Sequence, residues 1–170
     1  MRFITGGNLH YFPVCLSDII VPEIHLIVQM RSEMKELTLR HNRHSTYSLE
    51  YHLAVCTKYR HPVITGKLKD RLIELTRMVF EEYWNCTVIE VNTDKDHIHI
   101  LFEAPPQVQL SKLINNYKTV SARLIRKEFS EELSPYYWKP YFWSLAYFIC
   151  TVSERSEEAV KHYIQNQKGE

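Results

Sequence analysis

The sequence predicts an α+β domain of the ferredoxin-like type, in which a βαββαβ run forms a four-stranded antiparallel sheet with two helices on one face. Two patterns predict it: short β-favouring runs that end at turn residues, and longer stretches with an apolar residue every three or four positions. The length of 170 residues leaves room for one compact domain. A further, tyrosine-bearing helix is expected at the C-terminal end.

The first strand and the first helix are predicted from different periodicities. Residues 48–57 are rich in β-favouring side chains and predict a strand, which a basic loop follows at 58–65. Apolar residues at three- and four-residue spacing then predict a helix that ends near Trp84. These apolar residues are Leu68, Leu72, Leu75 and Val79.

In the second half of the domain, the sequence predicts a hairpin, a helix, a strand and a last helix. Residues 87–92 and 97–103 form the two hairpin strands, and residues 109–129 carry a helical apolar stripe. A fourth strand is predicted over 142–152 and a third helix over 156–167. In such a sheet the first and third strands are central, and the face without helices stays open unless another element covers it.

The composition excludes some classes of protein. Hydrophobic residues make up 45% of the chain and aromatic residues 12%, which is enough for a packed core and excludes a disordered chain. A net charge of +1 gives no global indication of a nucleic-acid partner. The four cysteines are widely spaced and indicate a reducing compartment, and no apolar stretch reaches the length of a membrane span. We therefore expect a cytoplasmic protein without a membrane partner.

The N-terminal residues 1–36 show no sustained helical or strand period, and glycines and prolines interrupt them. We therefore expect an extension that is not part of the native fold, followed by the domain over residues 37–170. An additional edge strand at residues 24–28 is the alternative interpretation.

Two histidines on the third predicted strand are the first candidate site. Because side chains alternate along a strand, His97 and His99 share one face with Leu101 and Glu103, while Ile98, Ile100 and Phe102 share the other. Two imidazoles at this spacing can chelate one divalent ion. A pair of ordinary surface histidines is the alternative.

The predicted last helix carries Tyr163 and Gln167, which lie four residues apart and therefore face the same way. An amide oxygen is a suitable third ligand for a hard divalent ion, and its burial without a partner would be costly. Core packing is the alternative role for Tyr163.

In this order, the residues resemble the single-tyrosine HUH transposases of the insertion-sequence-200-like group, which are named for a His-hydrophobic-His motif. The resemblance extends over about residues 41–167. The segments that carry it are 44–53, 58–63, 96–101, 142–144 with 147–148, and 163–167.

The resemblance implies a site and a chemistry. Tyr163 would cleave single-stranded DNA and leave a 5′-phosphotyrosine link, and His97, His99 and Gln167 would hold Mg²⁺ or Mn²⁺. It also implies a homodimer in which the tyrosine helix serves the partner's site, although docking within one subunit is the alternative. The DNA substrate would carry hairpins near element ends. No phosphate-binding glycine loop is present, so no nucleotide cofactor is expected.

Local charge, unlike net charge, is compatible with a DNA partner, and the family resemblance decides in favour of DNA. Residues 111–127 contain five basic and no acidic residues, and a second basic group includes the loop at 58–65. The residues expected to contact phosphates are Arg40, Arg43, Lys58, Arg60, Lys112, Lys118, Arg123 and Arg126. Tyr47, Tyr59 and Tyr117 are expected to stack on unpaired bases. A solvated helix face is the alternative for the basic helix.

Two other functions fit parts of the sequence. A non-catalytic RNA- or DNA-binding module could use the same fold, but its usual stacking aromatics on the central strands are replaced by His97 and His99. A histidine-based nucleotide hydrolase would need a further histidine at position 101, where this chain has Leu101.

Overall fold

The computed structural model describes residues 40–42 and 44–152 of the chain. Several predictions lie outside these residues; they concern the N-terminal extension (1–36), Arg43, and the C-terminal helix with Tyr163 and Gln167. None of the helices in the described part has the length and apolar character needed to cross a lipid bilayer.

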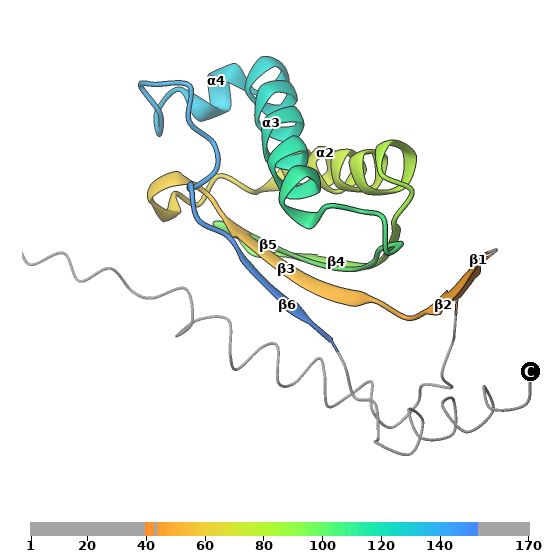
Figure 1. The fold of residues 1–170 in the computed structure, drawn as a ribbon. Helices are drawn as coiled ribbons and strands as arrows, with labels where there is room; N and C mark the ends of the chain where they lie inside the picture. The colour runs from red at the N-terminus through yellow and green to blue at the C-terminus, as the bar shows by residue number, and fades with distance from the viewer. Residues whose placement is uncertain (1–39, 43, 153–170) are drawn as a thin grey trace, which may run out of the picture. The chain divides into compact units, whose positions relative to one another are not determined.

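The centre of the domain is a four-stranded antiparallel sheet in the order β4-β5-β3-β6 (Figure 1). Its strands are β3 (Glu50–Cys56), β4 (Thr87–Thr93), β5 (His97–Glu103) and β6 (Phe148–Thr151). The predicted first and third strands, β3 and β5, are the central pair. The ferredoxin-like prediction is therefore confirmed in its strand order and in its antiparallel pairing.

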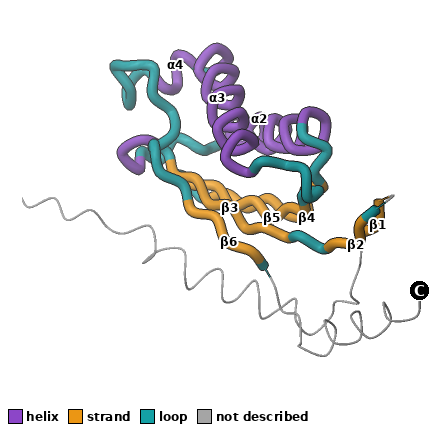
Figure 2. Tube along the Cα trace, viewed as in Figure 1, coloured by secondary structure: helices purple, strands orange, loops and turns teal. Residues whose placement is uncertain are grey.

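Two helices, α2 (Gly66–Arg77) and α3 (Leu110–Glu128), cover one face of this sheet (Figures 1 and 2). The short α4 (Ser130–Leu133) follows the end of α3. Under α2 and α3, Ile98, Ile100 and Phe102 of β5 are completely buried in the hydrophobic core. Burial of each such side chain stabilises the fold by about 1.5–3 kcal/mol.

A π-helical turn (Met78–Tyr83) continues α2 toward β4. It carries Phe80 into the core, where the ring lies edge-on to Phe102 at 4.8 Å and to Tyr117 at 5.3 Å between centroids. This turn therefore joins both helices to the central strand β5.

Two features of the fold differ from the sequence prediction. A hairpin of β1 (Arg40–Asn42) and β2 (Ser45–Tyr47) precedes the sheet, and strands of three residues are too short for a readable alternation.

The last strand begins at Phe148 rather than at 142, because Phe142 and Trp143 turn into the core instead. Trp143 forms an isolated bridge with Thr57, and its indole donates a hydrogen bond to Ser121 Oγ at 2.9 Å. The apolar run was therefore partly a buried loop.

Candidate metal centre and nucleic-acid interface

The sheet face opposite the helices, called here the histidine face, carries three histidines. In the register of β3 and β5, Ala54 pairs with His99 and His52 pairs with Leu101. Paired residues in an antiparallel sheet point to the same side, so His52, His97 and His99 share the face that the sequence predicted for the last two. The apolar residues that alternate with them lie in the core.

The three imidazoles form a compact group. The rings of His97 and His99 lie 4.9 Å apart at nearly a right angle, and both side chains are buried, with 6% of each residue exposed. The ring of His52 stacks on that of His99 at 5.0 Å, and His99 Nδ1 lies 3.2 Å from His52 Nε2. This hydrogen bond fixes the orientation of the His99 ring.

His97 is oriented by a carboxylate. Its Nδ1 lies 2.6 Å from Asp96 Oδ1, while the other carboxylate oxygen pairs with Arg60 Nε at 2.7 Å. Arg60 also donates to Cys56 Sγ at 3.1 Å. An acceptor at Nδ1 favours the tautomer in which Nε2 carries the lone pair, and this is the usual arrangement around a metal-binding histidine.

His52 supports His99 as a neutral ring. Its burial, and then the neighbouring His99, lower the pKa of His52 to about 4, although Glu90 opposes the shift. Its Nδ1 is buried, and within residues 40–42 and 44–152 it has no hydrogen-bond partner. His99 and His97 are thus held by two chemically different neighbours, one neutral and one anionic.

This donor set suits a divalent ion. Two imidazoles of the same strand converge, and each has a partner at Nδ1 that orients the ring. A second grouping lies at the start of β5, where ligand atoms of Asp94, Asp96 and His97 are within 4.8 Å of one another. Because Asp96 already bonds both Arg60 and His97, an ion in this grouping would compete with the Arg60 guanidinium.

Four of the basic residues predicted to contact DNA have internal partners. Arg40 Nε pairs with Glu103 at 3.0 Å, and Arg60 holds Asp96. Lys118 donates to the carbonyl of Leu145 at 2.7 Å and Arg126 to that of Tyr141 at 2.8 Å, so both fasten the loop before β6 to α3. Burial lowers the pKa of Lys118. Of the remaining predicted residues, Lys112 and Arg123 are exposed and Lys58 is half-buried; Arg43 lies outside the described residues.

The predicted stacking role of Tyr117 is wrong. This side chain is completely buried, and its hydroxyl lies 3.1 Å from Thr76 Oγ1 in the core between the helices. The same burial raises the pKa of Tyr117. Tyr59, in contrast, is 58% exposed and remains available to a ligand.

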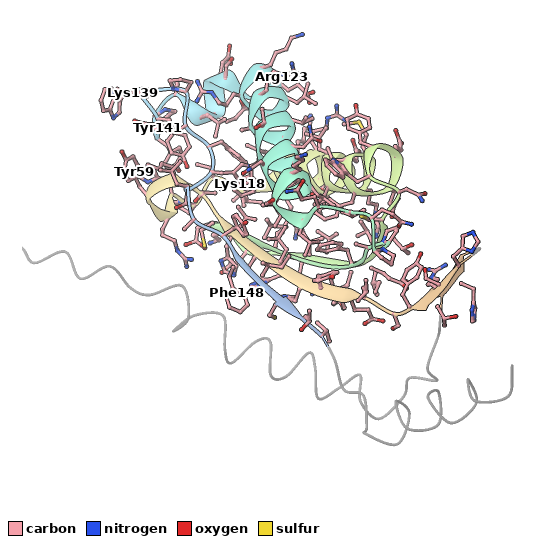
Figure 3. All side chains as sticks on the ribbon, viewed as in Figure 1. Tyr59, Lys118, Arg123, Lys139, Tyr141 and Phe148 are labelled. Carbon is pink, nitrogen blue, oxygen red and sulfur yellow. The ribbon has the colours of Figure 1, made fainter. Side chains whose placement is uncertain are left out.

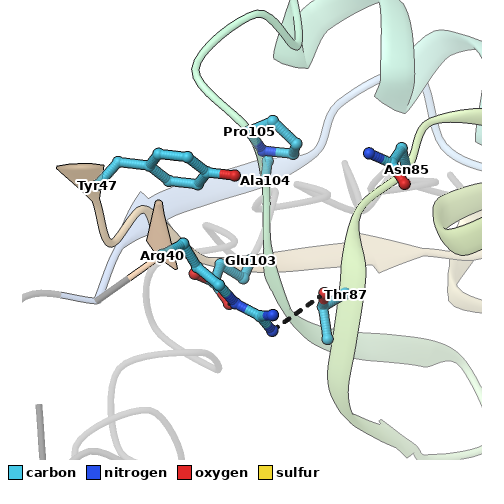
Figure 4. A pocket seen from close by; sticks show the side chains of 7 residues that line it. All are labelled: Arg40, Tyr47, Asn85, Thr87, Glu103, Ala104 and Pro105. Carbon is cyan, nitrogen blue, oxygen red and sulfur yellow. Dashed lines mark hydrogen bonds and ion pairs between the residues drawn. The ribbon is translucent and has the colours of Figure 1, made fainter. Parts of the chain in front are cut away.

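A separate polar cavity of about 170 Å³ lies at the other end of β5 (Figure 4). Glu103 and Arg40 form its charged wall, and Thr87 accepts a hydrogen bond from Arg40 at 3.4 Å. Glu103 is six residues from His97, which corresponds to about 20 Å along a strand. The cavity is therefore distinct from the start of β5, where His97 lies.

Two site residues were missed in the sequence, although both had a signal. His52 lies on the predicted first strand at even spacing from Ala54 and Cys56, which the register sets opposite His99 and His97. Asp96 directly precedes the histidine pair and was interpreted only as a turn residue. Neither role could be assigned before the strand register was known.

The comparisons with known proteins identify the family of this chain. Residues 45–167 match the family described as "Transposase IS200 like". The chain is 33% identical over 131 residues to the ISDra2 transposase TnpA of Deinococcus radiodurans, covering 77% of this chain and 92% of that protein. The chain belongs to the IS200-like transposase family.

One further relative and one solved structure support the assignment. The IS200 transposase of Salmonella typhimurium is 26% identical over 128 residues, which cover 74% of this chain and 83% of that protein. A crystal structure of a Deinococcus radiodurans protein described as a transposase superposes with a TM-score of 0.62 at 30% identity, over 75% of this chain and 97% of that chain. The family predicted from the ordered motifs is thus confirmed.

Proposed function

We propose that this member of the IS200-like family cleaves and rejoins single-stranded DNA at insertion-sequence ends through a 5′-phosphotyrosine intermediate on Tyr163. The observation that carries the proposal is the convergence of His97 and His99 on the histidine face, each with an orienting partner. Family membership over residues 45–167 supports it, since that range includes both histidines and Tyr163.

In this proposal His97, His99 and Gln167 hold Mg²⁺ or Mn²⁺. A bound divalent ion would supply Lewis-acid polarisation of the scissile phosphate and would stabilise charge on its oxygens. Asp96, held in turn by Arg60, keeps His97 in the coordinating tautomer, and His52 keeps the His99 ring in place.

The reaction needs no external energy source. The Tyr163 phenol loses its proton as its oxygen forms a bond to phosphorus, and the bond from phosphorus to the 3′ oxygen breaks. That oxygen takes up a proton and leaves as a 3′-hydroxyl. In strand transfer another 3′-hydroxyl attacks the phosphotyrosine and releases Tyr163, so the number of phosphodiester bonds is conserved.

The proposed partners are single strands with hairpins at element ends and a second copy of this chain. In the proposed homodimer the helix with Tyr163 and Gln167 completes the histidine site of the partner subunit. Mixing His97→Ala and Tyr163→Phe subunits tests this arrangement, because activity restored in the mixture requires sites built from two chains.

Trapping of a covalent adduct tests the chemistry. The protein is incubated with labelled single-stranded element ends and Mn²⁺, and the products are separated on a denaturing gel. Tyr163→Phe and addition of a chelator should each abolish the adduct, whereas Tyr83→Phe, at an exposed tyrosine of the π-helical turn, should leave it unchanged. An adduct that survives Tyr163→Phe contradicts the proposed nucleophile.

A further inference from the structure

An exposed aromatic surface lies beyond the histidine face, where the chain leaves β3. Two segments form it: the short 3₁₀ turn η1 (Lys58–Arg60) with the following residue, and residues 136–141 of the loop after α4. Its rings are Tyr59, His61, Tyr136, Trp138 and Tyr141, and its cations are Lys58 and Lys139. Figure 3 shows Tyr59, Tyr141 and Lys139 gathered on one side of the molecule, near α4.

We infer that this aromatic surface binds the unpaired bases of single-stranded DNA by stacking. The choice of DNA rests on the proposed function. The surface itself rests on described residues, and none of its rings or of the cations Lys58 and Lys139 was needed for the metal site.

The exposure of these rings is the first argument. Trp138 is 79% exposed and Tyr59 58% exposed, and Tyr136 is also open to solvent. Aromatic side chains usually bury most of their area, and an exposed group of them marks a binding surface.

Four of the rings, those of Tyr59, His61, Tyr136 and Tyr141, also form a continuous series across the two segments. Tyr59 lies edge-on to Tyr141 at 6.0 Å between centroids and to His61 at 5.9 Å. His61 in turn lies 5.6 Å from Tyr136. Rings at these separations offer neighbouring faces and edges, which suits several successive bases.

Cations lie between the rings. Lys58 Nζ is 4.8 Å from the centre of Tyr59 and 5.5 Å from that of Tyr141, and Lys139 Nζ is 4.4 Å from that of Trp138. No acidic residue occurs in residues 57–69 or 133–147. Alternating aromatic and positive groups match the bases and phosphates of a flexible strand, whereas a duplex hides the faces of its bases by stacking.

The backbone of η1 connects this surface to the metal site. Tyr59 and Arg60 have φ angles of 61° and 58°, in the left-handed region that residues other than glycine seldom occupy. Tyr137 holds this turn by donating a hydrogen bond to the carbonyl of Lys58 at 3.1 Å. While Tyr59 points outward, Arg60 reaches Asp96, which orients His97. Only the side chains of Arg60 and Asp96 would therefore connect the backbone at Tyr59, where the strand stacks, to His97 of the proposed metal site.

Binding of an unstructured strand to the full chain tests the inference. A fluorescein-labelled single strand without self-complementarity is titrated in chelator, and anisotropy reports the dissociation constant. Tyr59→Ala and Trp138→Ala should each weaken binding about tenfold, as loss of one stacking partner does. Tyr59→Phe should bind normally because it keeps the ring. Tyr83→Ala is the matched control, since Tyr83 is 57% exposed but belongs to the π-helical turn.

Several outcomes overturn the inference. Normal affinity in both Tyr59→Ala and Trp138→Ala would overturn it, as would an equal loss of affinity in Tyr83→Ala. Tighter binding of the matching duplex than of the single strand would also overturn it. So would a loss of affinity that appears only with single-stranded RNA. Trp138 does not support the core, and a circular dichroism spectrum verifies the fold of each variant. The binding test is independent of the cleavage test. If the protein forms the covalent adduct but the alanine variants bind the strand normally, only the inference is contradicted. If the alanine variants bind weakly but no adduct forms, only the proposed function is contradicted.

Discussion

Both faces of strand β5 carry buried side chains, but the side chains on the two faces make different kinds of contact. Toward the helices, Ile98, Ile100 and Phe102 meet only apolar neighbours. On the other face His97 and His99 are almost as deeply buried, yet their contacts are hydrogen bonds to Asp96 and His52. One strand thus stabilises the fold with one set of side chains and orients candidate ligands with the alternate set, and neighbouring substitutions should separate these roles.

The largest effect on stability is expected on the helix-covered face. Phe102→Ala should lower the free energy of unfolding by about 3–5 kcal/mol, because it removes a fully buried ring and leaves a cavity beside Phe80. Urea denaturation followed by circular dichroism measures this loss. His97→Ala is the comparison, and it should abolish adduct formation at a much smaller cost in stability. A similar loss of stability in both variants would contradict the separation of the two faces.

On the histidine face, Asp96→Asn should weaken Mn²⁺ binding about 10–100-fold, since an amide orients and polarises His97 less well than a carboxylate. Calorimetric titration of the full chain measures the affinity. Asp94→Asn is the matched control, because Asp94 lies nearby but its carboxylate accepts from the backbone of Lys95. Equal losses in the two variants would place the ion in the acidic grouping instead.

Loss of the neutral His52 beside His99 should weaken metal binding less than loss of the anionic Asp96 beside His97. His52→Phe keeps a stacked ring but removes the hydrogen bond to His99 Nδ1, and we expect roughly tenfold weaker Mn²⁺ binding. His52→Gln, which can still hydrogen-bond, should recover part of the affinity. Unchanged affinity in His52→Phe would show that stacking alone orients His99.

The smallest effect concerns alkaline pH and the helix-covered face. Burial raises the pKa of Cys86 from 9.0 to about 12, so the unfolded chain ionises first and stability falls as pH rises from 9 toward 12. At pH 10 the Cys86 thiol is ionised in the unfolded chain but still protonated in the folded protein, and this difference should lower the free energy of unfolding by about 1 kcal/mol. Urea denaturation of Cys86→Ala at pH 8 and pH 10 should show a correspondingly smaller decrease than the unsubstituted protein. An identical decrease would mean that other groups cause the alkaline loss.

The sequence was sufficient for the sheet because its periodicities were local. Strand β5 was predicted with its observed bounds, since His97–Glu103 begins with alternating histidines and isoleucines, and turn residues precede it. Trp143 could not be placed, because its hydrogen bond to Ser121 depends on how a loop meets α3. Patterns within one element were readable, and contacts between elements were not.

The same distinction applies to the candidate site. His97 and His99 were recognised because they belong to one strand, whereas the role of His52 depends on the register between β3 and β5. Lys118 and Arg126 were predicted to contact DNA from local charge together with the family resemblance. Their bonds to loop carbonyls show that a basic residue in the sequence is not always an available charge.

The π-helical turn between α2 and β4 has a consequence for how the length of this segment can vary. A π-helical turn contains one residue more than the α-helical turn that it replaces. Loss of one residue from Met78–Tyr83 would therefore leave a regular α-helical turn, with the flanking side chains close to their present orientation. The same deletion inside α2, which is regular α-helix, would rotate the side chains on one side of it by about 100°. A single-residue deletion in the π-helical turn should therefore be less damaging than one in α2, provided that Phe80 keeps its contacts with Phe102 and Tyr117.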